Sequence, residues 1–341
     1  MSRSSCFVNG YFRNQPVTGQ QRFAAEIADR LPELLPDVTE LLPSRWASSR
    51  GRQWIELQTT LPRRVGKGLL ISLTSRTPWC GVRQLVTIYD LFPLTNPEWY
   101  SREFSLLHRR LLLHNATHAD GIIVTSEPVR IAVAALARPG IPIVVAPAAP
   151  SLNFGGPPEN MAATASPYFL AVGSIEPRKN LRRLLDAYGA LDANVRAGVP
   201  LLIVGDRTAI FASAGIEDAP PPAGVRFLGR VTDAELAALY RDATVFVSPS
   251  LDEGFGIPLV EAAQITNGVM VVSDIPVYRW VMGTTPAIYV DPLDVESIAS
   301  GLQAALTATA DVEALRALAR RFSWDESAQT IAALARELSA N

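Results

Sequence analysis

Two glutamates, Glu253 and Glu261, lie on either side of the sequence Gly-Phe-Gly-Ile-Pro-Leu-Val. They follow an apolar, β-like run over residues 243–250, and Pro258 suits the first turn of a helix. We therefore expect Glu253 on the loop after a strand and Glu261 about one turn into the next helix. The glycines would allow close approach of a ligand, and the helix N-terminus offers free N–H groups to an anion. A phosphate at this turn, with a carboxylate on each side to accept from hydroxyl groups, would suit a sugar nucleotide. The alternative is a pair of exposed charges around an ordinary turn.

A second group that could bind a sugar nucleotide is the cationic pair Arg178 and Lys179, which follows a strand, a turn and Pro177. These side chains could neutralise a diphosphate and stabilise a nucleoside diphosphate as it leaves. A solvated basic helix start is the alternative. Cations near a helix N-terminus are electrostatically unfavourable, and this local conflict favours a functional role.

Apolar β-branched runs alternate with helical patterns along the whole chain. Strand-like runs cover residues 85–89, 121–125, 143–146, 169–172, 201–204, 225–228, 245–248 and 269–273, and helical patterns lie between them, for example over 103–116 and 180–191. This alternation is typical of doubly wound α/β domains with parallel sheets. The length of 341 residues exceeds the usual size of one hydrophobic core, so we expect two domains. A stretch rich in Pro, Gly and Ala over 151–166 indicates the linker.

Four segments together resemble one enzyme family. They are residues 168–180 with Glu-Pro-Arg-Lys-Asn, 201–206, 225–236, and 253–261 with its Glu-x7-Glu spacing. In this order they resemble the retaining GT-B glycosyltransferases of family GT4, most of all the bacterial polysaccharide mannosyltransferases. The resemblance covers residues 165–330 well and the N-terminal half more loosely. It implies two Rossmann-like domains facing a cleft, with an acceptor-side domain over 1–150 and a nucleotide-sugar-binding domain over 167–322. A C-terminal helix over 323–341 would cross back to the first domain.

The resemblance also implies roles for individual residues. Glu253 would bind hydroxyls of the donor sugar, Glu261 would bind the ribose, and Arg178 with Lys179 would bind the diphosphate. The other expected donor-binding residues are Gly19, Gly173, Arg230, Val231, Gly254, Phe255, Gly256 and Ile257. The expected catalytic residues are Glu253, Lys179, Arg178 and Asp90, and no protein nucleophile is identified. Simpler alternatives stay open, since Arg230 and Val231 could form a plain strand-end loop and Gly173 could only terminate its strand.

In the first half, residues 18–23 resemble the glycine loop that enters the family's first helix. Gly19 could face the donor phosphates across the cleft. Gln20 and Arg22 could do the same or belong to a plain helix entry.

Residues 87–93 resemble a segment that often reads His-Asp in this family, but here the first position is Tyr89. Tyrosine cannot act as a neutral imidazole does at neutral pH, so a histidine role in sugar binding or proton transfer is in doubt. Asp90, at the expected strand end, could orient the acceptor or cap a neighbouring helix.

The net charge of −2 is divided unevenly along the chain. Residues 1–150 hold 17 Lys and Arg against 11 Asp and Glu, whereas the remainder holds 14 against 22. A basic first half could favour an anionic acceptor such as a lipid diphosphate, or a membrane surface. A chance distribution of solvated charges is the alternative. Nucleic-acid binding is not expected, because basic and aromatic residues are not interleaved in a recognisable motif.

Nothing in the sequence indicates a metal or a bound cofactor. Cys6 and Cys80 do not have metal-ligand spacing, and His114 and His118 lack an evident third ligand. The Asp-x-Asp element of metal-dependent glycosyltransferases is absent. No run of about eighteen apolar residues or signal-peptide core is present. We expect a cytoplasmic protein and leave open peripheral contact with the inner face of the membrane.

These patterns lead us to expect a metal-independent, retaining transferase that moves a sugar from a nucleotide sugar to a glycan or a polyprenyl-diphosphate-linked saccharide. GDP-mannose is favoured as the donor over a UDP-sugar. A sugar-nucleotide epimerase is an alternative, although it would need an acid/base set that this histidine-poor chain does not offer. A non-catalytic sugar-nucleotide-binding protein is another, discouraged by the presence of both glutamates and the Arg-Lys pair.

Overall fold

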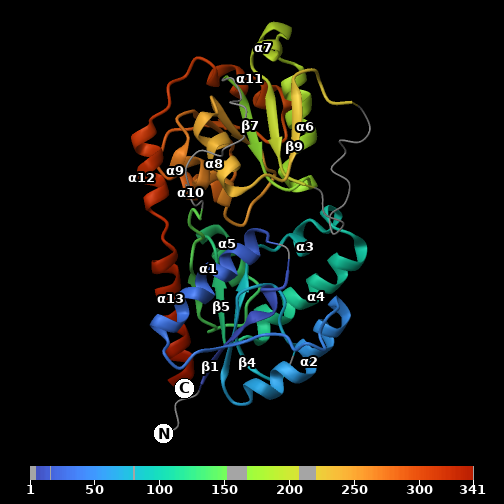
Figure 1. Ribbon diagram of the computed structural model, residues 1–341, viewed down its shortest axis with the longest axis vertical. Helices are drawn as coiled ribbons and strands as arrows, with labels where there is room; N and C mark the ends of the chain where they lie inside the picture. The colour runs from blue at the N-terminus through green and yellow to red at the C-terminus, as the bar shows by residue number, and fades with distance from the viewer. Residues whose placement is uncertain (1–4, 16, 80, 152–166, 207–219, 341) are drawn as a thin grey trace. The chain divides into compact units, whose positions relative to one another are not determined.

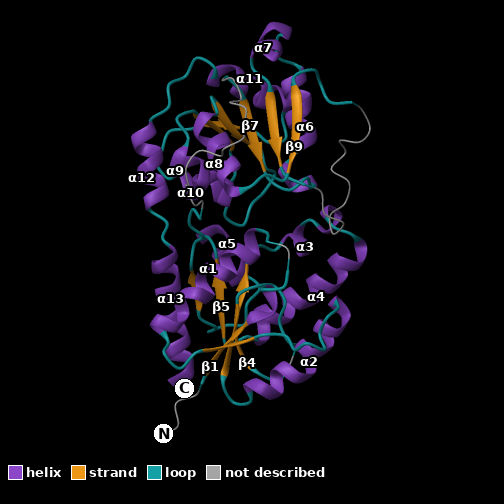
Figure 2. Ribbon diagram, viewed as in Figure 1, coloured by secondary structure: helices purple, strands orange, loops and turns teal. Residues whose placement is uncertain are grey.

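The computed structural model describes residues 5–15, 17–79, 81–151, 167–206 and 220–340. The chain divides into two compact units (Figure 1). Unit 1 comprises Met1–Thr95, Ser105–Ala148 and Ser323–Asn341, and unit 2 comprises Asn96–Phe104 and Ala149–Phe322. Except for Ser151, the linker predicted over 151–166 lies outside the described residues. Each unit contains one parallel six-stranded sheet flanked by helices (Figure 2).

The sheet of unit 1 has the strand order β2-β1-β3-β4-β5-β6. Its strands are β1 Cys6–Asn9, β2 Thr39–Leu41, β3 Leu69–Ser72, β4 Arg83–Ile88, β5 Gly121–Val124 and β6 Ile143–Val145. β3 and β5 are buried at every position, as expected for parallel strands that are covered on both faces.

The helices of unit 1 include one from the end of the chain. They are η1 Gly10–Phe12, α1 Gly19–Leu34, α2 Arg50–Val65, α3 Phe92–Thr95, α4 Arg102–His118, α5 Glu127–Ala134 and α13 Trp324–Ala340, with the first residues of α4 grouped in unit 2. α13 packs against α1 and against β3, β5 and β6. Trp324 meets the ring of Phe23 edge to face at 5.7 Å, and Asp325 pairs with Arg30 at 2.7 Å. The last helix therefore completes the core of the unit in which the chain begins.

The sheet of unit 2 has the strand order β12-β11-β10-β7-β8-β9. Its strands are β7 Phe169–Val172, β8 Leu201–Val204, β9 Val225–Gly229, β10 Val245–Ser248, β11 Val269–Ser273 and β12 Ile288–Val290. Its helices are η2 Pro97–Trp99, η3 Pro177–Lys179, α6 Leu181–Gly189, α7 Ala193–Gly198, α8 Asp233–Asp242, α9 Ile257–Ile265, α10 Pro276–Met282, α11 Val295–Ala305 and α12 Val312–Arg320. A core of buried side chains from β7, β8, β10 and β11 packs against α6 and α11.

In each sheet, the direction in which the chain adds successive strands reverses at one point. In unit 2 the chain runs outward from β7 to β8 and β9, and then returns to place β10 on the other side of β7. In unit 1, β2 and β3 lie on opposite sides of β1. Loops at such a switch point leave in opposite directions and open a crevice at the carboxyl ends of the strands, where α/β proteins bind ligands. The loops after β7 and β10 are therefore the first place to look for a site in unit 2.

Candidate functional site

The loop after β7 brings the two predicted cations to the switch point of unit 2. Gly173 follows β7 with φ of 153°, and a Cβ atom added there would lie 3.1 Å from Cε of Lys179. The stem of Lys179 thus lies across Gly173, and a larger side chain at this position would displace it. The absence of a side chain at Gly173 thus lets Lys179 pack against the strand end, and the expected contact of Gly173 with the donor stays a prediction.

Asn180 joins this loop to the loop after β10. It has φ of 58°, the left-handed conformation that side chains other than glycine seldom adopt. Its buried Nδ2 donates to the carbonyl oxygens of Pro249 at 2.9 Å and Pro292 at 2.6 Å. The N–H of Leu251 in turn donates to the carbonyl of Arg178 at 2.8 Å. These bonds hold both cationic residues at a fixed place relative to the Glu253 loop.

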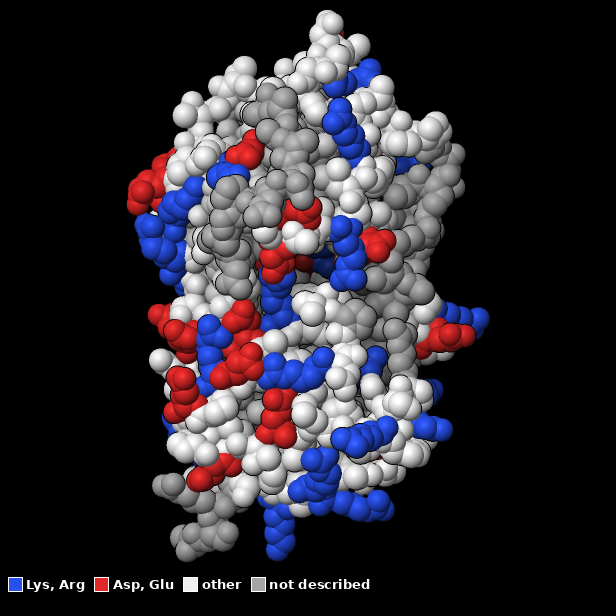
Figure 3. Space-filling model, in the orientation of Figure 1, with Lys and Arg blue, Asp and Glu red and all other residues white. Residues whose placement is uncertain are grey.

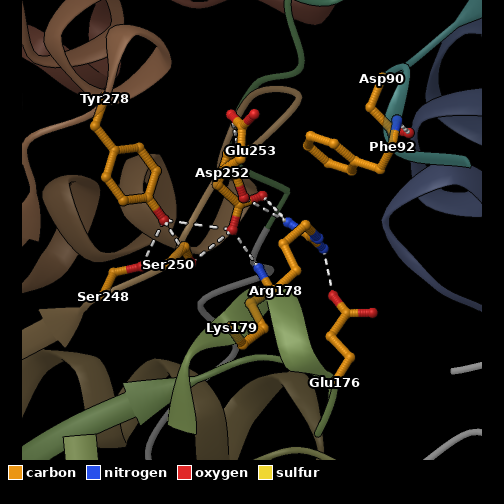
Figure 4. A network of polar contacts seen from close by, with 10 residues as sticks. All are labelled: Asp90, Phe92, Glu176, Arg178, Lys179, Ser248, Ser250, Asp252, Glu253 and Tyr278. Atoms are coloured by element: carbon orange, nitrogen blue, oxygen red, sulfur yellow. Dashed lines mark hydrogen bonds and ion pairs between the residues drawn. The ribbon is translucent and has the colours of Figure 1, made fainter. Parts of the chain in front are cut away.

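The carboxylate of Glu253 lies at the centre of a polar cluster (Figure 4). Oε1 accepts from Nζ of Lys179 at 2.6 Å and from the Ser250 hydroxyl at 2.9 Å. Oε2 accepts from Nη1 of Arg178. Glu253 is only 5 % exposed, and Glu261 is equally buried. The alternative of two solvent-facing charges around an ordinary turn is therefore wrong.

The two cations set the charge of this carboxylate. Burial alone would raise the pKa of Glu253, but the charges of Arg178 and Lys179, together with hydrogen bonds from Lys179 and Ser250, outweigh burial and lower the pKa to about 2. The net pKa shift of the neighbouring Asp252 is in the opposite direction, because burial raises the pKa of that carboxyl. Glu253 is consequently ionised at neutral pH.

Arg178 is shared between two buried carboxylates. Its Nη1 donates to Glu253, and its Nη2 donates to Oε1 of Glu176. Glu176 is fully buried, and its Oε2 has no hydrogen-bond partner among the described residues. The guanidinium is thus held from two sides, which fixes its plane at the carboxyl edge of the sheet.

The Gly-Phe-Gly turn leads from Glu253 into α9. Gly254 is partly buried, and Gly256 has φ of 97° and precedes Ile257, the first residue of α9. The Phe255 ring is buried and packs edge to face on Phe322 at 5.1 Å. This geometry gives the turn a fixed backbone at a helix N-terminus, as an anion site requires.

Glu261 lies inside α9 and has a tyrosine contact. The hydroxyl of Tyr240, on α8, donates to Oε2 of Glu261 at 3.3 Å. Both glutamates of the spacing motif are therefore buried, Glu253 on the loop before α9 and Glu261 within α9.

Arg230 and Val231 occupy the short connection between β9 and α8. The Arg230 side chain is exposed, and Val231 is partly buried. Thr232 closes the connection with a capping box to Glu235 at the start of α8. β9 is the outer strand of its sheet and is separated from β7 by β8, so this connection starts from a different strand than the loops that carry the cationic pair and Glu253. Their role in recognising the base stays a prediction.

The predicted residues of unit 1 lie on separate elements of that unit. Gly19 is exposed and is the first residue of α1. Tyr89 follows β4, and its hydroxyl lies 2.6 Å from the carbonyl oxygen of Leu73 and 3.3 Å from that of Gln20. Burial raises the pKa of Tyr89 well above its usual value. Oδ1 of Asp90 accepts from the N–H of Phe92, the first residue of α3, at 3.1 Å. Its expected role in orienting the acceptor stays a prediction.

The two spaced histidines are packed against each other. The rings of His114 and His118 are stacked at 4.5 Å, and Trp79 stacks on His114 at 5.9 Å. Burial lowers the pKa of His114. Among the described residues, no three His, Cys, Asp or Glu side chains gather where they could hold a metal ion. Cys6 is a buried free thiol, and Cys80 lies outside the described residues.

Several residues of the cluster were not predicted from sequence. Glu176 and Asn180 flank the cationic pair and Ser250 lies just before Glu253, so their polar type beside these motifs was an available signal. Tyr278 also reaches the cluster, from α10, and no local pattern marked it.

Comparison with known proteins agrees with this geometry. Residues 157–322 match the family described as glycosyl transferases group 1. Unit 2 carries a glycosyl transferases group 1 domain. The O-antigen chain mannosyltransferase B of Escherichia coli is 36 % identical over 179 residues, which is 48 % of this chain and 44 % of that protein. The O-antigen chain mannosyltransferase RfbU of Salmonella typhimurium is 38 % identical over 138 residues, or 40 % of this chain and 37 % of that protein. The aligned regions span less than half the length of these relatives.

Solved structures share the fold of this protein over nearly the whole chain. A sucrose-phosphate synthase from Thermosynechococcus elongatus superposes with a TM-score of 0.71 at 19 % identity, covering 99 % of this chain and 100 % of that one. The glycosyltransferase domain thus belongs to a two-domain GT-B fold, as predicted. The roles expected for individual residues stay predictions.

Proposed function

We propose that this protein is a retaining glycosyltransferase that transfers a sugar from a nucleotide-sugar donor to a glycan or lipid-linked saccharide. The observation that carries the proposal is the convergence of Arg178, Lys179 and Glu253 at the switch point, beside the N-terminus of α9. Two cations and a helix N-terminus suit a diphosphate, and a buried carboxylate suits sugar hydroxyls. The family of the domain and its mannosyltransferase relatives support this assignment.

GDP-mannose is the donor we favour, because the relatives in sequence are named mannosyltransferases. A UDP-sugar is the alternative. In either case Arg178 and Lys179 would bind the diphosphate, Glu261 the ribose and the loop at Arg230 and Val231 the base.

The proposed chemistry needs no protein nucleophile and no metal. The bond between the anomeric carbon and the diphosphate oxygen breaks, and the acceptor hydroxyl attacks from the same face. The departing phosphate oxygen takes the acceptor proton, so the products are the glycosylated acceptor and the nucleoside diphosphate. Lys179 and Arg178 would stabilise the negative charge that grows on the leaving group. To do so they must share their charge between the diphosphate and Glu253.

A thermal-shift panel with GDP, UDP, ADP and their common sugars, with and without EDTA, tests donor binding. A ligand that binds only the folded protein raises its apparent stability. We expect an EDTA-insensitive shift that is largest with GDP-mannose. A UDP-selective shift would keep the site and discard mannose, and no shift at about millimolar ligand would contradict a donor site.

Turnover separates the transferase from two other functions. Lys179→Ala and Glu253→Ala should each severely reduce transfer in folded protein, and near-normal rates in both would overturn the proposal. Epimerised nucleotide sugar formed without acceptor would identify an epimerase. A binding protein without catalysis would show donor affinity and no turnover in the wild type.

We further propose that unit 1 provides the acceptor side and contacts a membrane surface at α2 and α4. On α4, Leu106, Arg109, Arg110 and Leu113 are exposed with the spacing of one helix face, and Leu106 is 54 % exposed. On α2, Ile55 is 52 % exposed and lies between exposed arginines. Lys and Arg side chains gather over the α2 region of unit 1 (Figure 3). Basic side chains with exposed apolar ones suit an anionic bilayer surface.

Co-sedimentation with vesicles of phosphatidylglycerol or phosphatidylcholine tests this contact. We expect binding to the anionic vesicles that is lost in Arg109→Glu/Arg110→Glu and kept in Arg241→Glu, a charge reversal in unit 2. Equal behaviour of the two variants would contradict the surface. No helix among the described residues is long and apolar enough to cross a bilayer, so the contact proposed is peripheral.

A further inference from the structure

Tyr278 connects α10 to the proposed donor site through its hydroxyl. The side chain is almost fully buried, and its oxygen lies 2.5 Å from Oγ of Ser248, 3.3 Å from Oγ of Ser250 and 3.4 Å from Oε1 of Glu253 (Figure 4). Burial raises the pKa of Tyr278 well above its usual value, so the hydroxyl keeps its proton. It can therefore donate one hydrogen bond at a time.

One arrangement of protons satisfies all three hydroxyls. Ser248 donates to the Tyr278 oxygen, Tyr278 donates to Ser250, and Ser250 donates to Oε1 of Glu253 at 2.9 Å. Each hydroxyl then donates once, and the series ends on the only anion in it. Successive hydrogen bonds that point the same way strengthen one another, which favours the carboxylate at the end.

The ring of Tyr278 makes a second contact with the same loop. A Cβ atom added to Gly256 would lie 2.8 Å from Cε1 of Tyr278, so the ring packs directly against the backbone of the Gly-Phe-Gly turn. One side chain thus touches both the glutamate and the turn that precedes α9.

This arrangement matters because the cations bound to Glu253 would be needed elsewhere when donor binds. Arg178 and Lys179 hold the carboxylate from one side. A diphosphate would draw their charge away, and the carboxylate would then depend on its neutral partners for its orientation. We propose that Tyr278, acting through Ser250, is a positioning residue that holds Glu253 toward the sugar of the bound donor. This inference rests on the proposed function and refines the sugar part of that site.

The test is calorimetric titration of wild type and Tyr278→Phe with GDP and GDP-mannose, and with UDP and UDP-glucose. The variant keeps the ring and removes only the hydroxyl. We expect affinity for the nucleotide sugar to fall about tenfold while affinity for the matching nucleoside diphosphate stays within about twofold. In the Glu253→Ala background, Tyr278→Phe should add no further loss, because the two residues act as one unit.

Tyr188→Phe is the matched control. It removes another buried tyrosine hydroxyl of unit 2, one that bonds the carbonyls of Arg196 at 3.2 Å and Val199 at 3.1 Å, away from the cluster. In Tyr188→Phe, the ratio of the affinity for the nucleotide sugar to the affinity for the nucleoside diphosphate should equal that of wild type. Equal losses for nucleotide and nucleotide sugar in Tyr278→Phe, or an additive loss with Glu253→Ala, would overturn the positioning role alone. Wild type that binds none of the four ligands would overturn the proposed function and this inference with it.

Discussion

The two units have the same kind of sheet, yet their switch points differ in chemistry. In unit 2, the loops after β7 and β10 bring two cations and two carboxylates together in a buried cluster. In unit 1, the corresponding region holds the neutral hydroxyl of Tyr89, which contacts the backbone of Leu73 after β3 and of Gln20 in α1. The sheet topology provides the location in both units, and the side chains decide what it can bind. A charged cluster suits an anionic donor, whereas a neutral hydroxyl that bonds backbone mainly holds the loops in place.

The largest effect is expected from Lys179→Ala, which removes a cation from the unit 2 cluster. The catalytic efficiency kcat/KM should fall about 100- to 1,000-fold, the usual loss for one group that stabilises transition-state charge. Steady-state transfer from the donor chosen by thermal shift measures it. Arg182→Ala is the control, because that guanidinium lies three positions further on and forms an exposed pair with Asp186 at 3.1 Å. A comparable loss in the control would mean that the effect is not specific to the cluster.

Glu253→Gln should destabilise unit 2, because it leaves Arg178 and Lys179 without their shared anion. We expect the free energy of unfolding at neutral pH to fall by about 3 kcal/mol. The pKa of Glu253 is lowered from 4.5 to about 2 on folding, so the ionised group stabilises the native state above about pH 4.5. That contribution is lost as pH falls toward 2, and the difference between variant and wild type should shrink over this window.

Urea unfolding across this pH range measures the difference. Asp274→Asn, which breaks an exposed pair with Arg279, is the control and should change stability by less than about 1 kcal/mol. A variant–wild-type difference that stays constant down to about pH 3 would argue against a strongly ionised Glu253.

Asn180 allows the rigidity of the unit 2 loops to be tested. Asn180→Gly keeps the left-handed backbone but leaves the carbonyls of Pro249 and Pro292 unpaired, and should lower the free energy of unfolding by about 2 kcal/mol. Asn180→Ala should lower it by about 1 kcal/mol more, because alanine does not favour positive φ. Chemical denaturation of both variants measures which of the two is less stable. An alanine variant as stable as the glycine variant would contradict the strained conformation.

The smallest effect is expected in unit 1. Tyr89→Phe removes one hydroxyl that bonds backbone and should lower the free energy of unfolding by about 1 kcal/mol. Because the pKa of Tyr89 is raised, its hydroxyl stays protonated at neutral pH, and the pH profile of kcat/KM should match that of wild type. A pH profile that changes in the variant would give Tyr89 a chemical role and remove the contrast between the units.

Much of the fold was predictable because continuous β-branched runs form buried parallel strands. The predicted runs over 169–172, 201–204, 245–248 and 269–273 coincide with β7, β8, β10 and β11. β2, β3 and β12 were not predicted from sequence; β2 and β12 have three residues each and lie at the edge of their sheets, and β3 has four. The grouping of Asn96–Phe104 with unit 2 also has no local signal, because it depends on tertiary packing.

The residue types of the site could be predicted, but their pairing could not. Spacing placed Glu253 after a strand and Lys179 after another, and no local pattern says that β10 and β7 are neighbours. That adjacency is what turns a cation and a carboxylate 74 residues apart into an ion pair. Tyr278 was missed for the same reason, since it reaches Glu253 from α10, beyond the following strand.

The return of α13 to unit 1 has a consequence for the order of synthesis. Strands β1 to β6 are synthesised before β7, but α13, which packs against β3, β5 and β6, is synthesised only after β12. A nascent chain can therefore complete strands β7 to β12 while the faces of α1, β3, β5 and β6 that α13 contacts are still uncovered. We expect unit 1 to close only after α13 has been synthesised, and until then to be the part of the molecule most exposed to chaperones and proteases.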